Sequence, residues 1–227
     1  MKENKHNMII KNIFFDFDGV IAESVAAKTE AFREMYMPYG EEIANKVVEY
    51  HMKHGGVSRY EKFRYWEKKF FGKNISNERT QELAQEFSEL VLKKVIYANE
   101  VSGVKAFLEK YYKRLNFWII TGTPTTEIEI IARERGLTSY FLGIHGSPER
   151  KRYWTEYLIE NYNLKREETF FLGDATTDQD AASFSKLHFA LKENEENKCI
   201  FEDYKGIRFK DFETLEKQLK EYFVKRK

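Results

Sequence analysis

Residues 13–19 read IFFDFDG, an apolar run that changes abruptly to two aspartates and a glycine. Residues 170–180 repeat the plan as FFLGDATTDQD, so five of the seven aspartates of the chain stand in two short clusters. Aspartate is disfavoured within strands but suits the position just past a strand end. In open α/β folds the carboxyl ends of parallel strands form the crevice that binds ligands. The two clusters therefore predict a phosphate and magnesium site at one edge of a sheet.

Both clusters also have a simpler interpretation as turns. Asp and Gly commonly end strands, and a single cluster would leave the two interpretations about equally good. Two clusters, each directly behind an apolar run, favour the functional interpretation.

The composition indicates a folded protein with balanced charge. Hydrophobic residues make up 42% of the 227 residues, enough for a substantial core, and the formal net charge is +1. This balance gives no electrostatic footprint for nucleic acid. Cys199 is the single cysteine, and no apolar run approaches the roughly 18 residues of a membrane span. With no secretory signal in the sequence, we expect a cytoplasmic location and neither a nucleic-acid nor a membrane partner.

Short apolar runs alternate with segments of helical spacing outside residues 22–95. The predicted buried strands are Ile13–Phe17, Phe117–Ile120, Phe141–Ile144, Phe170–Leu172 and His188–Leu191. The apolar stripes of predicted helices between them include Val104, Phe107, Leu108 and Tyr111, and Tyr153, Trp154, Tyr157 and Leu158. This alternation predicts an α/β fold with a doubly wound parallel sheet covered by helices on both faces.

Residues 22–95 break the alternation because they contain no clear strand. They are predicted to form helices at Ala26–Met37, Glu41–Lys53 and Ser58–Phe71, and a last helix with Leu83, Phe87, Leu90 and Val91 on one face. We therefore expect an α/β core domain of residues 1–21 and 96–227, with an all-α helical domain of residues 22–95 inserted into it.

The turn before the third of these helices carries a Gly-Gly pair at residues 55–56 and a cluster of polar and cationic side chains. We predict that it faces the crevice and that Arg59 binds the non-reacting end of a substrate through its forked guanidinium. The alternative is a solvated surface arginine. His51 is interpreted as solvated or substrate-facing rather than metal-bound, and Lys62 is expected on the outside of its helix.

Two further segments would reach the same crevice. The strand at residues 117–120 leads into Thr121 and Gly122, which could offer a hydroxyl and free N–H groups to a phosphate. Lys151 follows the next strand and could neutralise a transferring phosphoryl group. On spacing alone, Thr121 is better explained as a helix N-cap or a strand-end turn residue, and Arg150 and Arg152 compete with Lys151 for its role.

Four segments together resemble the motifs of the haloacid dehalogenase superfamily of aspartate-nucleophile phosphotransferases. They are residues 13–20 (IFFDFDGV), 119–122 (IITG), 146–151 (GSPERK) and 171–178 (FLGDATTD). The first and last are specific, whereas the middle two match by position. The helical segment after the first motif resembles the branch with a helical cap, which includes phosphoglycolate phosphatases and β-phosphoglucomutases.

The resemblance implies roles for the aspartates. Asp16 would be the nucleophile and a Mg²⁺ ligand. Asp18 would be the general acid and base and would give the metal its backbone carbonyl. Asp174 would be a further Mg²⁺ ligand, with Asp178 as a ligand or a partner of the ligands. Carboxylates suit these tasks because Mg²⁺ prefers oxygen ligands and a carboxylate can accept a phosphoryl group.

The resemblance also assigns the phosphoryl group to Thr121, Gly122 and Lys151, with Thr121 and Lys151 in the catalytic set. Gly122 stands where Asn is common in the family, and Glu23 where Asp is more usual. The first of these departures leaves the phosphate contacts of the second motif less certain.

These roles imply a Mg²⁺-dependent phosphatase that hydrolyses a small phosphate monoester, of the sugar phosphate or phospho-acid class, through an aspartyl-phosphate. A phosphomutase of the β-phosphoglucomutase type could use the same residues. A non-catalytic binding protein on this fold is a third possibility, although none of the expected catalytic residues is missing. The expected partner is a small phosphorylated metabolite, and the sequence leaves monomer and dimer equally open.

Overall fold

The computed structural model describes residues 9–219, 222 and 223. Its centre is an all-parallel sheet with the order β3-β2-β1-β4-β5-β6. The strands are β1 (Asn12–Phe15), β2 (Asn116–Pro124), β3 (Gly143–Ser147), β4 (Thr169–Gly173), β5 (His188–Lys192) and β6 (Ile207–Phe209). The order reverses between β1 and β4, so their carboxyl ends mark the point where such sheets bind ligands.

Helices cover both faces of the sheet. Successive residues of a strand point to opposite faces, and because successive residues here are apolar, both faces must be covered. Phe14 belongs to a core cluster beneath α7 (Lys151–Asn161) and α8 (Thr176–Phe184). Its neighbour Phe15 belongs to the larger cluster beneath α5 (Val104–Tyr111), α6 (Thr125–Glu134) and α9 (Phe212–Leu219). The predicted α/β fold with a doubly wound sheet is therefore confirmed.

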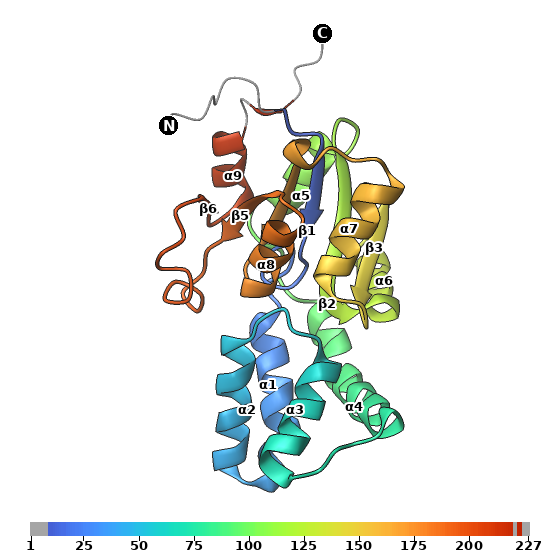
Figure 1. Ribbon diagram of the computed structural model, residues 1–227, viewed down its shortest axis with the longest axis vertical. Coiled ribbons are helices and arrows are strands. Elements are labelled where there is room, and N and C mark those ends of the chain that lie inside the picture. Colours follow the sequence, from blue (N-terminus) through green and yellow to red (C-terminus); the bar gives the residue numbers. More distant parts are fainter. Residues whose placement is uncertain (1–8, 220–221, 224–227) are drawn as a thin grey trace.

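Four helices form a second layer next to the carboxyl edge of the sheet (Figure 1). They are α1 (Val25–Tyr36), α2 (Glu41–Lys53), α3 (Arg59–Phe71) and α4 (Asn77–Ile96). We call this layer the cap. It has its own aromatic centre, in which Phe32 stacks on Phe87 at 4.0 Å between ring centroids and meets Trp66 edge-on at 5.0 Å. The predicted inserted helical cap is confirmed.

Two chain segments connect the cap to the core, and they run side by side. Glu23 donates its backbone N–H to Asn99, and Val101 donates its own to Ile21. The predicted boundaries at residues 21/22 and 95/96 fall close to these segments and stay predictions.

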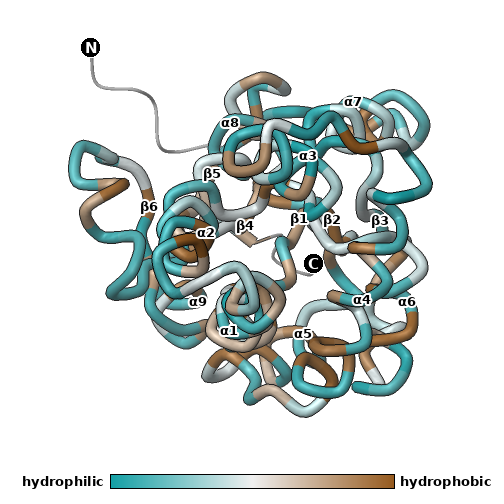
Figure 2. The backbone as a smooth tube through the Cα atoms, turned by 90° about the horizontal axis from the view of Figure 1, so that it is seen from below, coloured by the Kyte–Doolittle hydropathy of each residue, from teal (hydrophilic) through white to brown (hydrophobic). Residues whose placement is uncertain are grey.

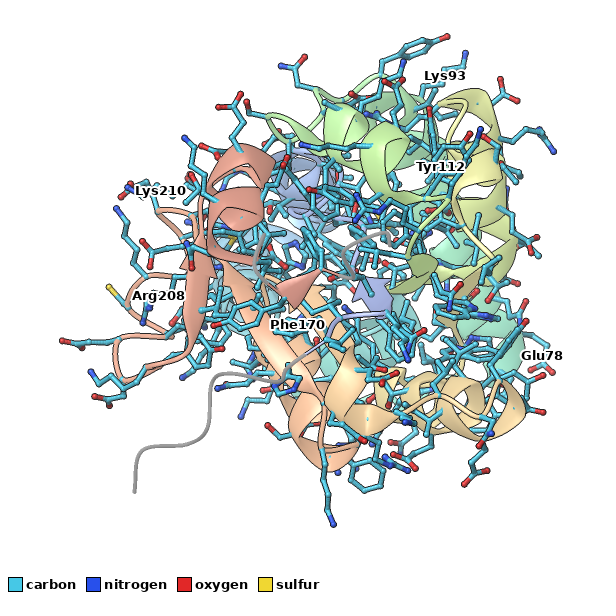
Figure 3. The ribbon with its side chains drawn as sticks, turned by 90° about the horizontal axis from the view of Figure 1, so that it is seen from above. Glu78, Lys93, Tyr112, Phe170, Arg208 and Lys210 are labelled. Carbon is cyan, nitrogen blue, oxygen red and sulfur yellow. The ribbon has the colours of Figure 1, made fainter. Side chains whose placement is uncertain are left out.

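Hydropathy follows this layered arrangement. In Figure 2 the hydrophobic stretches of β1 and β2 lie inside a ring of helices whose outer turns are hydrophilic. Figure 3 shows Phe170 within the sheet region and the charged side chains of Glu78, Lys93, Arg208 and Lys210 extending from the periphery.

Some predicted elements differ from the structure. Strand β6 was not predicted; it is a three-residue edge strand whose side chains are mostly only half-buried. The predicted strand at residues 141–144 lies at Gly143–Ser147 instead. In α7 the expected stripe is right for Leu158 and for Trp154, which packs on the core, but wrong for Tyr153, which is 52% exposed. Lys151 and Thr155 are buried on this helix instead. This helix is turned so that its first residue reaches the carboxyl edge of the sheet.

Candidate active site

The central lysine of the site is Lys151, the first residue of α7. It is buried, and its Nζ lies 2.6 Å from Asp16 Oδ2 and 2.5 Å from Asp178 Oδ1. Asp16 follows directly on β1, and Asp178 lies in the first turn of α8, which follows β4. The structure thus brings together three side chains that are up to 162 positions apart in the sequence, 178 − 16.

Three carboxylates converge beside this lysine. Ligand atoms of Asp16, Asp174 and Asp178 all lie within 4.8 Å of one another. Burial, followed by repulsion from Asp16 and Asp178, holds the pKa of Asp174 well above its usual value. Burial likewise raises the pKa of Asp178 to about 7 although Lys151 opposes the shift. One lysine therefore does not offset three converging carboxylates, of which Asp16 and Asp178 are buried and Asp174 is half-buried. The oxygen donor set fits a divalent cation such as Mg²⁺.

Close packing keeps the carboxylates in place. Asp178 accepts a hydrogen bond from the backbone N–H of Ala175 at 3.0 Å, which ties it to the loop that carries Asp174. Gly19 has a φ of +77°, and a Cβ there would lie 2.1 Å from Asp174 Oδ2. The glycine of the first motif is therefore needed both for its backbone conformation and for the approach of Asp174.

Asp18 lies next to this group but has different partners. Its carboxylate accepts hydrogen bonds from Ser24 at 2.6 Å and from Thr123 at 3.0 Å, and it forms an ion pair with Lys28. Lys28 Nζ also donates to Thr123 Oγ1 at 2.6 Å. Burial alone would raise the pKa of Asp18, but the Lys28 ammonium outweighs it and the pKa lies below its usual value.

Sequence analysis missed Lys28 and Thr123. Lys28 lies on α1 of the cap, 10 positions from Asp18, and Thr123 lies 105 positions away on β2. A signal for Lys28 was present, because Lys28, Ala31 and Phe32 share the buried face of α1 at spacings of three and four residues. Thr123 follows Thr121 by two positions, so both side chains leave the strand on the same side.

We expect Lys28→Met to reduce kcat on an alkyl phosphate by about a hundredfold, because Asp18 loses the group that positions it and proton transfer contributes at least that much. The effect should be smaller on 4-nitrophenyl phosphate, whose leaving group needs little help from an acid. Steady-state rates of both substrates measure this, with Lys46→Met on the exposed surface of α2 as the control. Equal losses on both substrates would place the effect in the hydrolysis of the aspartyl-phosphate, which both substrates share. Unchanged rates on both substrates would contradict the role.

The remaining predicted phosphate ligands lie at the same edge. Thr121 is buried in the carboxyl-terminal half of β2 and, with Gly122, lines a cavity of about 100 Å³ between cap and core. Asp16, Asp18 and Asp174 line the core side of this cavity.

A family model described as haloacid dehalogenase-like hydrolase matches residues 13–192. The chain belongs to this family. The match covers 180 of the 227 residues, counted as 192 − 13 + 1, and includes all the predicted core site residues. The expectation of a hydrolase with this fold is confirmed. No curated protein matches the chain at significant sequence similarity.

Solved structures share the fold of this haloacid dehalogenase-like hydrolase at low sequence identity. A β-phosphoglucomutase from Clostridium difficile has 17% identity and a TM-score of 0.73, covering 94% of this chain and 97% of its own. A predicted phosphoglycolate phosphatase from Haemophilus somnus 129pt has 19% identity and a TM-score of 0.71, with coverages of 92% and 97%. CbbY from Rhodobacter sphaeroides, in complex with xylulose-(1,5)bisphosphate, has 15% identity and a TM-score of 0.69, with coverages of 90% and 95%. These likenesses show the fold.

The cap of this hydrolase contacts the core through glycines. A Cβ at Gly122 would lie 2.6 Å from the carbonyl oxygen of Gly56, and one at Gly56 would lie 1.9 Å from Thr177 Oγ1. Thr177 in turn donates to the carbonyl of Gly55 at 3.3 Å. The family departure at Gly122 therefore has a physical reason, because only glycine admits the backbone of the cap turn at this distance.

We expect Gly122→Ala to lower kcat/KM by about tenfold, or roughly 1.4 kcal/mol, because the added methyl group separates the cap turn from the site. Gly55→Ala is the matched milder change, since its Cβ would lie 3.3 Å from that of Ala175. Thermal unfolding of both variants should stay near that of the wild type. An unchanged kcat/KM for Gly122→Ala would show that the contact is not needed for turnover.

Arg59 is not the solvated surface residue that the alternative interpretation required. It is 4% exposed and lines the cavity, and its guanidinium meets both carboxylate oxygens of Glu127 on α6 at 2.6 and 2.8 Å. Ser88 on α4 donates to the same carboxylate at 2.5 Å. This buried pair links the cap to the core. The forked donors that a substrate would need are occupied by Glu127, so the role of Arg59 as a substrate contact stays a prediction.

Among the described residues, no helix is both long and apolar enough to span a membrane.

Proposed function

We propose that the chain is a Mg²⁺-dependent phosphatase that hydrolyses a small phosphate monoester through an aspartyl-phosphate on Asp16. The observation that carries this proposal is the contact of Lys151 with Asp16, at 2.6 Å, within a cluster of three carboxylates. A buried lysine here orients the nucleophile and supplies a positive charge for the phosphoryl oxygens.

Asp16, Asp174 and Asp178 would hold the metal, which when bound lowers the repulsion between the carboxylates and the substrate phosphate. In the first step, an oxygen of Asp16 attacks phosphorus and the bond to the substrate alkoxide breaks. Asp18 donates its proton to the leaving oxygen. Thr121 and the backbone of Gly122 would hold the phosphoryl oxygens.

In the second step, Asp18 takes a proton from a water molecule, and the resulting hydroxide attacks the phosphorus of the aspartyl-phosphate. The bond between Asp16 and phosphorus breaks, which releases phosphate and restores the carboxylate. The contacts of Asp18 with Lys28, Ser24 and Thr123 favour its ionised form, the form required for this step.

A phosphomutase is the second candidate, and the close contact between the cap turn and Gly122 favours it, because a covered phosphoenzyme is shielded from water. The xylulose-(1,5)bisphosphate complex of the fold neighbour CbbY supports a small phosphorylated sugar or acid as ligand in either case. A binding protein without activity is the weakest candidate, since Asp16, Asp18, Lys151 and Asp174 are all retained.

A panel of phosphorylated metabolites, assayed for phosphate release with Mg²⁺ and with a chelator, tests the proposal. Release that requires Mg²⁺ supports the phosphatase. Isomerised sugar phosphate without free phosphate would favour the mutase. Binding of these compounds without either product would favour the binding protein.

A further inference from the structure

The cap wall of the cavity contains a buried lysine for which the described part of the chain supplies no acidic partner. This residue is Lys62, on α3, which is 2% exposed and lines the cavity. From the sequence, Lys62 was expected on the solvent-exposed side of its helix. That expectation is wrong, because Arg59, Lys62, Phe63 and Trp66 share the buried face of α3. Arg64, two positions on, is exposed.

Three buried cations line this wall, and two of them are neutralised. Lys28 pairs with Asp18, and Arg59 pairs with Glu127. Lys62 has no carboxylate within ion-pair distance among residues 9–219, 222 and 223. Its single described hydrogen-bond partner is His51 Nδ1, at 2.7 Å. An ammonium buried in this way is costly unless an anion completes its surroundings.

His51 has an unsatisfied group at the same place. It is 8% exposed, lines the cavity from α2, and its Nε2 has no hydrogen-bond partner. Burial, followed by the charge of Lys62, holds the pKa of His51 well below its usual value, so the ring is neutral. Because an ammonium can only donate, Nδ1 accepts from Lys62 and the ring proton lies on Nε2. Lys62 and His51 therefore both present unused donors.

The cost of this arrangement is visible at Lys62 itself. Burial, and then the neighbouring Lys28, lower the pKa of Lys62 to about 7, and Asp18 opposes the shift. The charges of Lys28 and Asp18 therefore both act on Lys62. An anion bound at Lys62 would stabilise its charged form and satisfy the donors of both side chains.

We propose that Lys62 and His51 form a subsite for a second anionic group of the substrate, at the end that is not transferred. The substrate is then a phosphomonoester that also carries a carboxylate or a second phosphate, rather than a neutral sugar phosphate. This inference rests on the proposed function, and it selects a substrate class within it.

Matched synthetic probes test the subsite. One series has ω-carboxyalkyl phosphates of two to four carbons, a second has the corresponding ω-hydroxyalkyl phosphates, and a third has alkanediol bisphosphates. We expect the best anionic probe to exceed its hydroxyl counterpart in kcat/KM by about tenfold or more, as a buried charge contact requires. Preference for the carboxylate or for the second phosphate identifies the group. Equal values for all three series would overturn the subsite.

Lys62→Met should reduce the preference for the anionic probe to within about twofold, since the side chain keeps its length but loses its charge. Lys69→Met, on the exposed face of the same helix, should retain it. A preference that survives in Lys62→Met would overturn the assignment. Should that variant fail to fold, the comparison of probes on the wild type decides.

A binding experiment separates this inference from the proposed function. Calorimetric titration of Asp16→Asn with the same probes needs no turnover. Tighter binding of the anionic probe by about tenfold supports the subsite even if no probe is hydrolysed, in which case the proposed phosphatase fails alone. Hydrolysis of simple monoesters combined with equal binding of all probes overturns the subsite and leaves the phosphatase standing.

Discussion

Asp16→Asn is expected to reduce turnover below about one-hundredth of the wild-type rate, since loss of a nucleophile usually costs far more than that. The amide has nearly the size of the carboxylate, but it carries no negative charge and cannot accept the phosphoryl group. The protein should fold normally, as Lys151 keeps its contact with Asp178.

Phosphate release and mass spectrometry measure this together. Wild-type protein quenched during turnover should carry the mass of one phosphoryl group on the peptide that contains Asp16, and the variant should not. Asp203→Asn, at an exposed position, is the control. A variant that keeps more than about one-hundredth of the rate would exclude Asp16 as nucleophile.

Lys151→Met is expected to impair both activity and folding. Its loss leaves Asp16 and Asp178 without their cationic partner in a buried site, which costs about 3–5 kcal/mol of unfolding free energy. Turnover should fall by about a thousandfold, because positive charge at the transferring phosphoryl group is also lost.

Urea unfolding in the presence of a chelator measures the stability change, and a second series with Mg²⁺ should recover part of it. Lys165→Met is the control, because it removes an exposed lysine that precedes β4, away from the carboxyl ends of the strands. It should change the free energy of unfolding by no more than about 0.5 kcal/mol. An equally small change for Lys151→Met would mean that the carboxylates do not depend on this lysine.

The predicted substrate preference and these two variants concern the two sides of the site. Asp16 lines the core side of the cavity and contacts Lys151, whereas Lys62 and His51 lie on the cap. Lys28 connects the two sides, since it extends from the cap to Asp18. Substrate recognition and proton transfer are therefore expected to depend on the same placement of the cap on the core.

The sequence by itself determined the local features of the core. Each aspartate cluster directly follows an apolar run, so the end of the strand and the polar residues that leave it are encoded within a few positions. The absence of strands from residues 22–95 likewise predicted the cap. Lys151 was found through its place among the family motifs and not through composition, because it is one of 38 basic residues.

Only the tertiary structure decided which charges meet and which side chains are buried. Lys62 was placed outside because lysine is rarely buried. Its spacing from Arg59, Phe63 and Trp66 already indicated the inner face of the helix. No local pattern could pair Asp18 with Thr123, Arg59 with Glu127, or Gly122 with Gly56, since these contacts join segments 66 to 105 positions apart. Sequence periodicity shows which face of a helix is buried, but only the fold determines which groups that face contacts.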